Sequence, residues 1–185
     1  MTRLLLDACV LYPTVLRQIL LDVARSGVYR PLYSARILEE WRRAAARGGD
    51  ADAAIAAAEI AVLRADWPAG EVTLCTEPAA LSLPDPDDIH VFAAALEGRA
   101  DAIVTHNLRD FPGRTLARHG LSARSPDSVL LEFHAEGHPV RAAAAAAQSR
   151  MAALGRDMDL RVLLKRAGLP RLGKALTGSR KSPDP

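Results

Sequence analysis

The sequence contains few aromatic side chains, since phenylalanine, tryptophan and tyrosine together make up 4% of its 185 residues. Surfaces that bind single-stranded nucleic acid by base stacking need several such rings, so this scarcity argues against that class of protein. No apolar run approaches the length of a transmembrane helix, and the chain begins with a predicted strand instead of a signal peptide. We therefore expect a cytoplasmic protein with no membrane partner.

Cysteine is also scarce, because the chain has only Cys9 and Cys75. The two residues lack the short spacing of a zinc site and imply no disulfide framework. Hydrophobic residues make up 49% of the chain, which indicates a globular protein with a sizeable core and argues against a disordered one.

The net charge of +2 is unevenly distributed along the chain. From residue 156 onward, three acidic residues accompany eight basic ones, which are Arg156, Arg161, Lys165, Arg166, Arg171, Lys174, Arg180 and Lys181. Such a basic tail could contact a phosphate backbone. It could also be the solvated face of a helix followed by a frayed end, and for the tail alone we favour this simpler interpretation.

Apolar periodicity and turn residues predict that strands and helices alternate up to about residue 134. Strands are expected at residues 3–7, 29–33, 102–105 and 121–124, with a further short strand at 72–75. Helices are expected at residues 13–26, 35–47, 50–67, 85–98 and 126–136. Ser34 is expected to cap the second of these helices, and Asp50 the third. This alternation is typical of an α/β protein with a parallel sheet.

Beyond residue 134 the pattern is only helical and is interrupted by glycines. We therefore predict an α/β domain over residues 1–134, a helical appendage over 135–176 and a disordered tail over 177–185.

Acidic residues lie where several of these elements begin or end. Asp7 closes the strand 3–7, where a buried carboxylate must be paired, solvated or bound to a metal. On the helix 35–47, Glu39 has arginines at ion-pair spacing, whereas Glu40 lies nearer the apolar face. We therefore choose Asp7 and Glu40 as candidate site residues.

Three aspartates crowd the start of the helix 85–98. Asp85 is explained as the helix cap, with Pro86 at the first helical position. Asp88 lies at the top of the buried face, because apolar residues follow it three, four and seven positions later. Asp88 is the candidate site residue, while Asp87 is expected to be more exposed and could hold a water nearby.

Asp110 is the fourth candidate and lies in the loop after the strand 102–105. Thr105 and Asn107 are polar groups at the same strand end, although ordinary turn chemistry also accounts for Asn and Asp in such a loop. His106 is expected near the mouth of the site, without a catalytic role. Acids gathered without cationic partners repel one another, so such a set usually holds a divalent metal.

These residues together resemble a PIN-domain nuclease, and in particular a VapC-type toxin of a bacterial toxin–antitoxin pair. The resemblance covers about residues 2–131 and depends on the order and spacing of Asp7, Glu40, Asp88 in PDPDDIHVFAAA and Asp110 in IVTHNLRDF. It implies a three-layer α/β/α sandwich around a parallel sheet. It also implies that these four acids bind the metal and act in catalysis. Many PIN domains have an acid where Asn107 stands, so here the fourth position shifts to Asp110.

The resemblance implies Mg²⁺- or Mn²⁺-dependent cleavage of RNA, a cognate antitoxin and a tendency to form homodimers. A carboxylate-held metal suits phosphodiester hydrolysis, because it activates water and contacts phosphate oxygens. Arg42, Arg43, Arg109 and Arg114 could contact phosphate or could be plain surface charge. The apolar helices of the appendage could bind the antitoxin, a second subunit or the core.

Two other functions are weighed against the nuclease. A phosphotransferase of the haloacid-dehalogenase type also starts with an aspartate at a strand end, but it requires a second aspartate where Cys9 stands. A PIN-like RNA- or protein-binding module with an inactive site is the other alternative. The complete set of acids argues against it, while Asn107 leaves room for weak activity.

Overall fold

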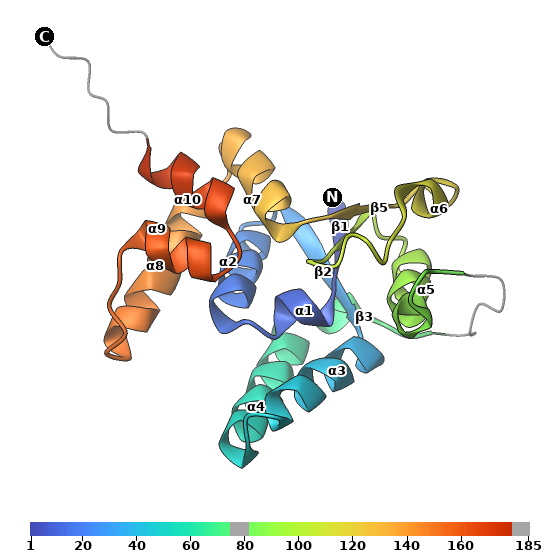
Figure 1. Cartoon of the computed structure of the whole chain (residues 1–185), viewed down its shortest axis with the longest axis horizontal. Coiled ribbons are helices and arrows are strands. Elements are labelled where there is room, and N and C mark those ends of the chain that lie inside the picture. The colour runs from blue at the N-terminus through green and yellow to red at the C-terminus, as the bar shows by residue number, and fades with distance from the viewer. Residues whose placement is uncertain (75–81, 179–185) are drawn as a thin grey trace, which may run out of the picture. The chain divides into compact units, whose positions relative to one another are not determined.

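A computed structural model describes residues 1–74 and 82–178 of the chain (Figure 1). It contains two compact units, and neither is continuous in sequence. The first unit comprises Met1–Tyr12 and Tyr29–Ser125, and the second comprises Pro13–Val28 and the described residues from Pro126 onward. Within the described part of the chain, no helix has the length and apolar character needed to cross a membrane.

The first unit is built on a five-stranded parallel sheet with the strand order β3-β2-β1-β4-β5. The strands are β1 (Thr2–Leu6), β2 (Tyr29–Ser34), β3 (Glu71–Val72), β4 (Ala102–Val104) and β5 (Ser122–Arg124). The central strand β1 carries the continuous apolar run, and Leu4, Leu5 and Leu6 are all buried, as expected for a strand covered on both faces. The parallel sheet flanked by helices confirms the predicted α/β fold.

Pro31 in β2 is typical of a less central or irregular strand. In agreement, β1 is the central strand of the sheet, and β2 lies between it and the short edge strand β3. The proline is tolerated because β3 is only two residues long and pairs with Tyr33 and Ser34, so β3 does not extend as far as Pro31.

Helices of the first unit pack on the sheet and on one another. They are α1 (Ala8–Leu11), α3 (Ala35–Ala46), α4 (Asp50–Asp66), α5 (Ile89–Glu97) and α6 (Gly113–Ala117), with short 3₁₀ turns η1 (Pro68–Gly70) and η2 (Pro86–Asp88). Helix α5 packs on β1, β2 and β4, while α3 packs on β2 and beside α1 and α4.

Capping residues explain where two of these helices begin. The Ser34 hydroxyl accepts a hydrogen bond from the Ile37 N–H at 3.3 Å, which confirms its predicted role as the cap of α3. Asp50 was expected to cap the next helix but is the first residue of α4. Gly49 precedes it with a positive φ of 109°, a conformation that glycine adopts readily.

The end of α5 is fixed by a close approach to the sheet. Gly98 follows α5, as predicted, and a β-carbon at this position would lie 2.8 Å from Val72 Cγ2 and 2.9 Å from Leu32 Cδ1. Only glycine lets the end of α5 come this close to the side chains of β2 and β3. This contact holds the start of the turn that leads into β4.

The second unit is helical. Its helices are α2 (Thr14–Arg25), α7 (Pro126–Ala135), α8 (Val140–Ala153), α9 (Leu160–Arg166) and α10 (Pro170–Thr177). Helix α2 packs against α8, while α10 packs against both α7 and α9. Buried Asp127 of α7 accepts hydrogen bonds from the backbone N–H groups of Arg171 and Leu172, so it caps the start of α10.

The division into these two units differs from the predicted domain boundary between residues 134 and 135. Helices α2 and α7 precede that boundary for most or all of their length, but they pack with the helices of the predicted appendage. The predicted disordered tail, residues 177–185, overlaps α10 by one residue, because Thr177 is the last residue of that helix. Residues 179–185 lie outside the described part of the chain, as does Cys75. The assignment of functional domains stays a prediction.

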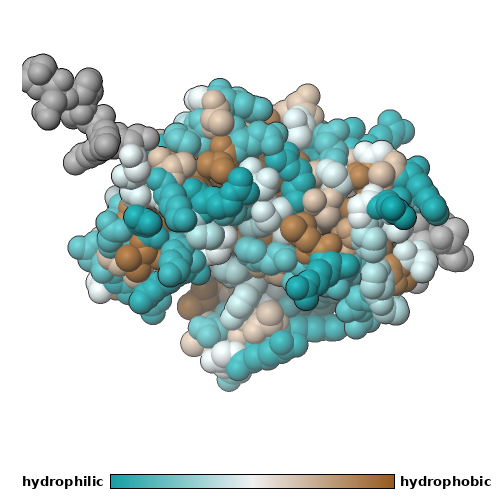
Figure 2. All heavy atoms as spheres, turned by 45° about the horizontal axis from the view of Figure 1, so that its top comes forward, coloured by the Kyte–Doolittle hydropathy of each residue, from teal (hydrophilic) through white to brown (hydrophobic). Residues whose placement is uncertain are grey.

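The exposed surface is mainly hydrophilic on the face that Figure 2 draws, with small separate hydrophobic areas. Large apolar side chains that are exposed occur singly or in pairs along the chain, and they include Ile55 and Val62 on α4. Scattered residues of this kind are normal on a globular protein and do not by themselves mark a binding surface.

Candidate functional site

Asp7 directly follows β1 and is buried, with 4% of its surface exposed. Its backbone N–H donates to the Val104 carbonyl of β4 at 3.2 Å, so the residue stands where two neighbouring strands end. The Thr105 hydroxyl donates to Asp7 Oδ2 at 2.6 Å, and the Cys9 thiol donates to the same oxygen at 3.1 Å. Among the described residues, Oδ1 accepts no hydrogen bond, so one oxygen is held in place and the other is available to a ligand.

Cys9 connects Asp7 to the loop after β4. Burial, followed by the negative charge of Asp7, raises the pKa of the Cys9 thiol to about 12, so at neutral pH the thiol keeps its proton and donates to Asp7. Its sulfur lies 3.3 Å from Thr105 Oγ1 and accepts the His106 N–H at 3.3 Å. The Asn107 N–H in turn donates to Thr105 Oγ1 at 3.0 Å. The loop and the carboxylate therefore hold each other in position.

Asp88 lies at the end of η2 and is partly buried. Burial, followed by the negative charges of Asp7, Asp110 and Asp85, raises the pKa of its carboxyl to about 6, while the charge of His90 acts in the opposite direction. Asp85 accepts the Asp87 N–H at 2.9 Å, which confirms its predicted capping role. The charges of Asp7 and Asp110, two of the other predicted site acids, therefore act on Asp88.

Asp110 belongs to this group through the turn that follows β4. Its backbone N–H donates to the Asn107 carbonyl at 3.0 Å, and the next residue, Phe111, is buried with 2% of its surface exposed. The buried ring anchors the far end of the turn. His106 is exposed at the near end, and partial desolvation lowers its pKa, although the charge of Asp7 acts in the opposite direction.

Glu40 is placed differently from the three aspartates. Glu39 accepts hydrogen bonds from Arg42 and Arg43, as expected for a surface ion-pair residue. Glu40 Oε1 lies 2.6 Å from His90 Nε2 and 4.0 Å from Arg36 Nε. Its charge is not among those that raise the pKa of Asp88, so the participation of Glu40 in the same site stays a prediction.

His90 is a buried polar residue beside Glu40, with 3% of its side chain exposed. Although Nε2 comes within 2.6 Å of the glutamate, the contact lacks hydrogen-bond geometry, and neither ring nitrogen has a hydrogen-bond partner among the described residues. This short contact therefore does not orient Glu40 through a directed hydrogen bond.

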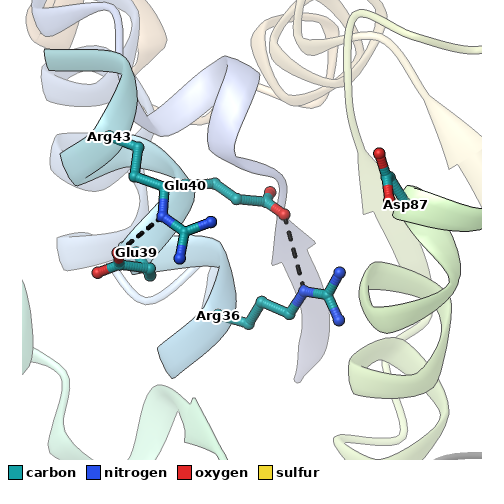
Figure 3. Close-up of a pocket in the computed structure, with 5 residues that line it drawn as sticks. All are labelled: Arg36, Glu39, Glu40, Arg43 and Asp87. Carbon is teal, nitrogen blue, oxygen red and sulfur yellow. Dashed lines mark hydrogen bonds and ion pairs between the residues drawn. The ribbon is translucent and has the colours of Figure 1, made fainter. Parts of the chain in front are cut away.

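A pocket of about 350 Å³ lies beside Glu40. Its lining residues are Arg36, Glu39, Glu40, Arg43 and Asp87. Figure 3 shows Glu40 and Arg36 extending from α3 toward the side of the pocket where Asp87 lies, while Glu39 and Arg43 pair with each other. Asp87 is exposed, as predicted, and the pocket contains charges of both signs.

The four arginines considered as phosphate contacts fall into two classes. Arg42 and Arg43 share the single carboxylate of Glu39, so their charges are compensated in part. Arg109 and Arg114 are exposed and have no ion pair within the described ranges of the chain. The second pair is therefore better suited to contact an external phosphate.

The aspartates offer a donor set that suits a hard divalent cation. Within residues 1–74 and 82–178, no three acidic, histidine or cysteine side chains converge at metal-coordinating distance. Mg²⁺ keeps several of its waters and is commonly held by only one or two direct carboxylates, so a tight cage is not required. The free oxygen of Asp7 fits such an ion, as do the negative charges that, after burial, help to raise the pKa of Asp88.

Sequence reasoning assigned no role to Cys9 or His90. The signal for Cys9 was its place two residues after Asp7, at the start of a helix, where a side chain can turn back toward the preceding residue. His90 follows Asp88 by two positions in a strongly apolar helix, so its burial could be anticipated. Its contact with Glu40 on α3 could not be anticipated, because nothing in the sequences of the two helices specifies that they meet.

Comparisons with known proteins add the following findings. A family model described as PIN domain matches residues 3–109, which is more than half of the chain and ends one residue before Asp110. The chain is 47% identical over 45 residues to a curated protein of Mycobacterium tuberculosis (strain ATCC 25618 / H37Rv) named "Putative ribonuclease VapC50". The matched stretch covers 24% of this chain and 27% of that protein, so the chain aligns with about a quarter of the relative's length. No solved structure matches the chain.

Proposed function

Because the chain belongs to the PIN-domain family, we propose that it is a divalent-metal-dependent endoribonuclease that acts in the cytoplasm as the toxin of a toxin–antitoxin pair. The metal is Mg²⁺ or Mn²⁺, and the substrate is RNA. The observation that carries this proposal is the group of Asp7, Asp88 and Asp110, in which neighbouring negative charges help to raise the pKa of Asp88. Such a group gains most from a bound cation.

In the proposed site, Asp7, Asp88 and Asp110 hold the metal, and Glu40 completes the set. When bound, the metal activates a water molecule and neutralises charge on the phosphate. The hydroxyl of Thr105 and the thiol of Cys9 orient Asp7 so that Oδ1 is available. Asp88 gives up its proton when a cation offsets the charges around it, which couples metal binding to proton release.

Exposed arginines would then position the RNA. Arg109 lies next to Asp110, and Arg114 follows within the short helix α6. Both are exposed, so either can reach a phosphate oxygen beside the acidic group. Arg42 and Arg43 contribute less, because Glu39 holds them.

The proposed partners follow from the same chemistry. A cognate antitoxin can silence the site by placing a basic side chain against the uncompensated acids. We also propose that the toxin forms a homodimer, as the family resemblance implies. The helical second unit offers additional surface for either partner.

The direct test is incubation of the purified protein with total cellular RNA, with Mg²⁺, with Mn²⁺ and with a chelator. Discrete fragments are expected with a metal and none with the chelator, and Asp110→Asn should prevent cleavage. Glu40→Gln tests whether the site contains four acids or only the three aspartates. Loss of cleavage in this variant would include Glu40 in the site. Calorimetric titration of each variant with Mn²⁺ reports metal binding separately from cleavage.

The alternative function, an inactive PIN-like binding module, predicts a different result. Folded protein that binds Mn²⁺ and RNA but produces no fragments under any of these conditions would favour it. Equal cleavage by wild type and Asp110→Asn would place the active site elsewhere or reveal a contaminating nuclease.

A further inference from the structure

The helices α9 and α10 carry a concentration of positive charge that the acidic site does not explain. Between Leu160 and Thr177 the chain contains no acidic residue and five basic ones, which are Arg161, Lys165, Arg166, Arg171 and Lys174. All five side chains are exposed. Across the described residues, none of the five has an acidic partner within ion-pair distance, which distinguishes them from Arg25 and Arg150, both held by Asp22.

Two of the neighbouring acids are occupied in capping, while Asp157 is exposed and has no ion pair with a described residue. Asp159 precedes α9 and accepts the backbone N–H groups of Arg161 and Val162. Asp127 is buried and accepts the backbone N–H groups at the start of α10. Both carboxylates are thus engaged by helix N-termini, and the outward-facing cations remain available to an external anion.

Helix stability accounts for only some of these cations. Lys165 and Arg166 lie in the last turn of α9, where the helix dipole favours positive charge. Arg161 and Arg171 lie in the first turns of α9 and α10, where the dipole disfavours it. A side chain that is unfavourable for its own helix and has no acidic partner suggests selection for binding.

The apolar side of the same helices is already buried. Leu163 and Leu164 of α9 and Leu172 and Leu176 of α10 are each at most 3% exposed, and the two helices pack against each other. An amphipathic helix that binds a membrane needs its apolar face free to enter the lipid. Val162 of α9 is an exception, with 44% of its surface exposed. One exposed apolar residue beside five exposed cations favours a polyanion over a membrane as the partner.

We propose that the exposed cations of α9 and α10, here named the basic face, bind the sugar–phosphate backbone of RNA. The inference rests on the proposed function, because RNA is the polyanion that a ribonuclease must engage. It adds an RNA-binding surface in the second unit, beyond the residues 3–109 that the family model matches. Binding through phosphates is independent of sequence and weakens as salt displaces the protein from the RNA.

The test measures binding of a short fluorescent single-stranded RNA by anisotropy at several salt concentrations. A chelator is present, and a gel confirms that the RNA remains intact. We expect Arg161→Gln/Arg171→Gln to lower the affinity roughly tenfold at low salt and to reduce the slope of log affinity against log salt by about 1 to 1.5. The thermal midpoint should not fall, because both arginines oppose their helix dipoles.

The matched control is Arg25→Gln/Arg64→Gln, which removes the same charge from exposed arginines that are paired with Asp22 and Glu71. Its affinity should stay within about twofold of wild type, as expected for compensated charges. Equal losses in both double variants, or none in either, would overturn the proposal. Unchanged RNA binding combined with lost binding of polyglutamate would instead assign the basic face to an acidic protein.

The RNA-binding measurement can fail or succeed independently of the cleavage measurement. If the intact protein cleaves no RNA with any metal but its binding still depends on Arg161 and Arg171, the basic face stands and the proposed nuclease fails. If it cleaves RNA and the double variant binds as tightly as wild type, the nuclease stands and the basic face fails.

Discussion

Asp7 of the first unit and Asp127 of the second are almost equally buried, with 4% and 6% of their surfaces exposed, yet their carboxylates are bonded differently. Both oxygens of Asp127 accept backbone N–H groups, from Arg171 at 3.0 Å and from Leu172 at 2.9 Å. The cost of burying its charge is offset by a helix N-terminus. Asp127 is therefore a structural residue.

The carboxylate of Asp7 is satisfied on one side only. Oδ2 accepts the Thr105 hydroxyl and the Cys9 thiol, while Oδ1 has no donor within the described chain. Its charge also helps to raise the pKa of Asp88. The comparison teaches that burial alone does not single out a candidate site residue, whereas a buried carboxylate with one free oxygen and acidic neighbours is a stronger candidate.

The largest effect is expected from Asp7→Asn, which removes a charge that the fold leaves uncompensated. Cleavage of RNA should fall by on the order of 10²- to 10³-fold, the range for loss of one preorganised electrostatic group. Initial rates of fragment formation with Mn²⁺ measure this effect. Asp101→Asn is the matched control, because Asp101 accepts the Arg3 N–H at 2.6 Å near the start of β1 and should leave the rate unchanged.

Thr105→Val tests whether orientation of the Asp7 carboxylate matters. The variant keeps the branched shape but loses the hydroxyl that donates to Asp7 at 2.6 Å. Affinity for Mn²⁺, measured by calorimetry, should fall by about 10- to 100-fold, as for other groups that orient a metal ligand. Thr105→Ser restores the hydroxyl and should restore binding, and a Ser variant as weak as the Val variant would contradict this role.

Asp127→Ala should lower the stability of the protein without lowering its cleavage activity, in contrast to Asp7→Asn. It leaves two backbone N–H groups of α10 without their acceptor, so the free energy of unfolding should fall by about 1 to 2 kcal/mol. Urea denaturation measures the change. Cleavage per folded molecule should match wild type, and a specific loss of cleavage without a loss of stability would remove the distinction between the two aspartates.

The smallest effect is a pH dependence at Asp88. Its folded-state pKa of about 6 lies above the ordinary value of 3.8, so the folded state favours the protonated form. This stabilisation is fully present below about pH 4 and is lost as the pH rises through about 6. In metal-free protein, Asp88→Asn should raise the free energy of unfolding by about 1 kcal/mol at about pH 7, after allowance for solvent screening, and change it little near pH 4.

Asp87→Asn is the control for that measurement, because Asp87 lies in the same turn but is exposed. It should change stability little at either pH. If Asp88→Asn raised the free energy of unfolding equally at both pH values, ionisation of Asp88 would not be the cause of the increase.

Much of the fold was predictable because local signals agreed with one another. The apolar run of β1, the Ser34 cap of α3 and the Asp85 cap before α5 each appear in the sequence and in the structure. The grouping of helices was not predictable. Helix α2 lies among the strands in sequence but packs against α8, and amphipathic periodicity does not specify which surface covers a helix.

The relative placement of some candidate site acids was also predictable. Asp7, Asp88 and Asp110 were expected to meet because the carboxyl ends of parallel strands lie at one sheet edge, and their charges do act on Asp88. Glu40 was chosen over Glu39 by its place on the helix. Its contact with His90 depends on the packing of α3 near α5, which residue spacing within either helix does not encode.

The pairing of α2 with α8 has a consequence for how the protein is made. The Arg150–Asp22 hydrogen bond joins residues separated by 128 positions, so α2 leaves the ribosome long before the helix it packs against. A chain truncated near residue 134 would lose that partner permanently. Assembly of the second unit must therefore wait until α8 and the helices after it have been synthesised, and contacts of such long sequence separation form slowly. Any nuclease activity that requires this unit is accordingly delayed until those helices have left the ribosome.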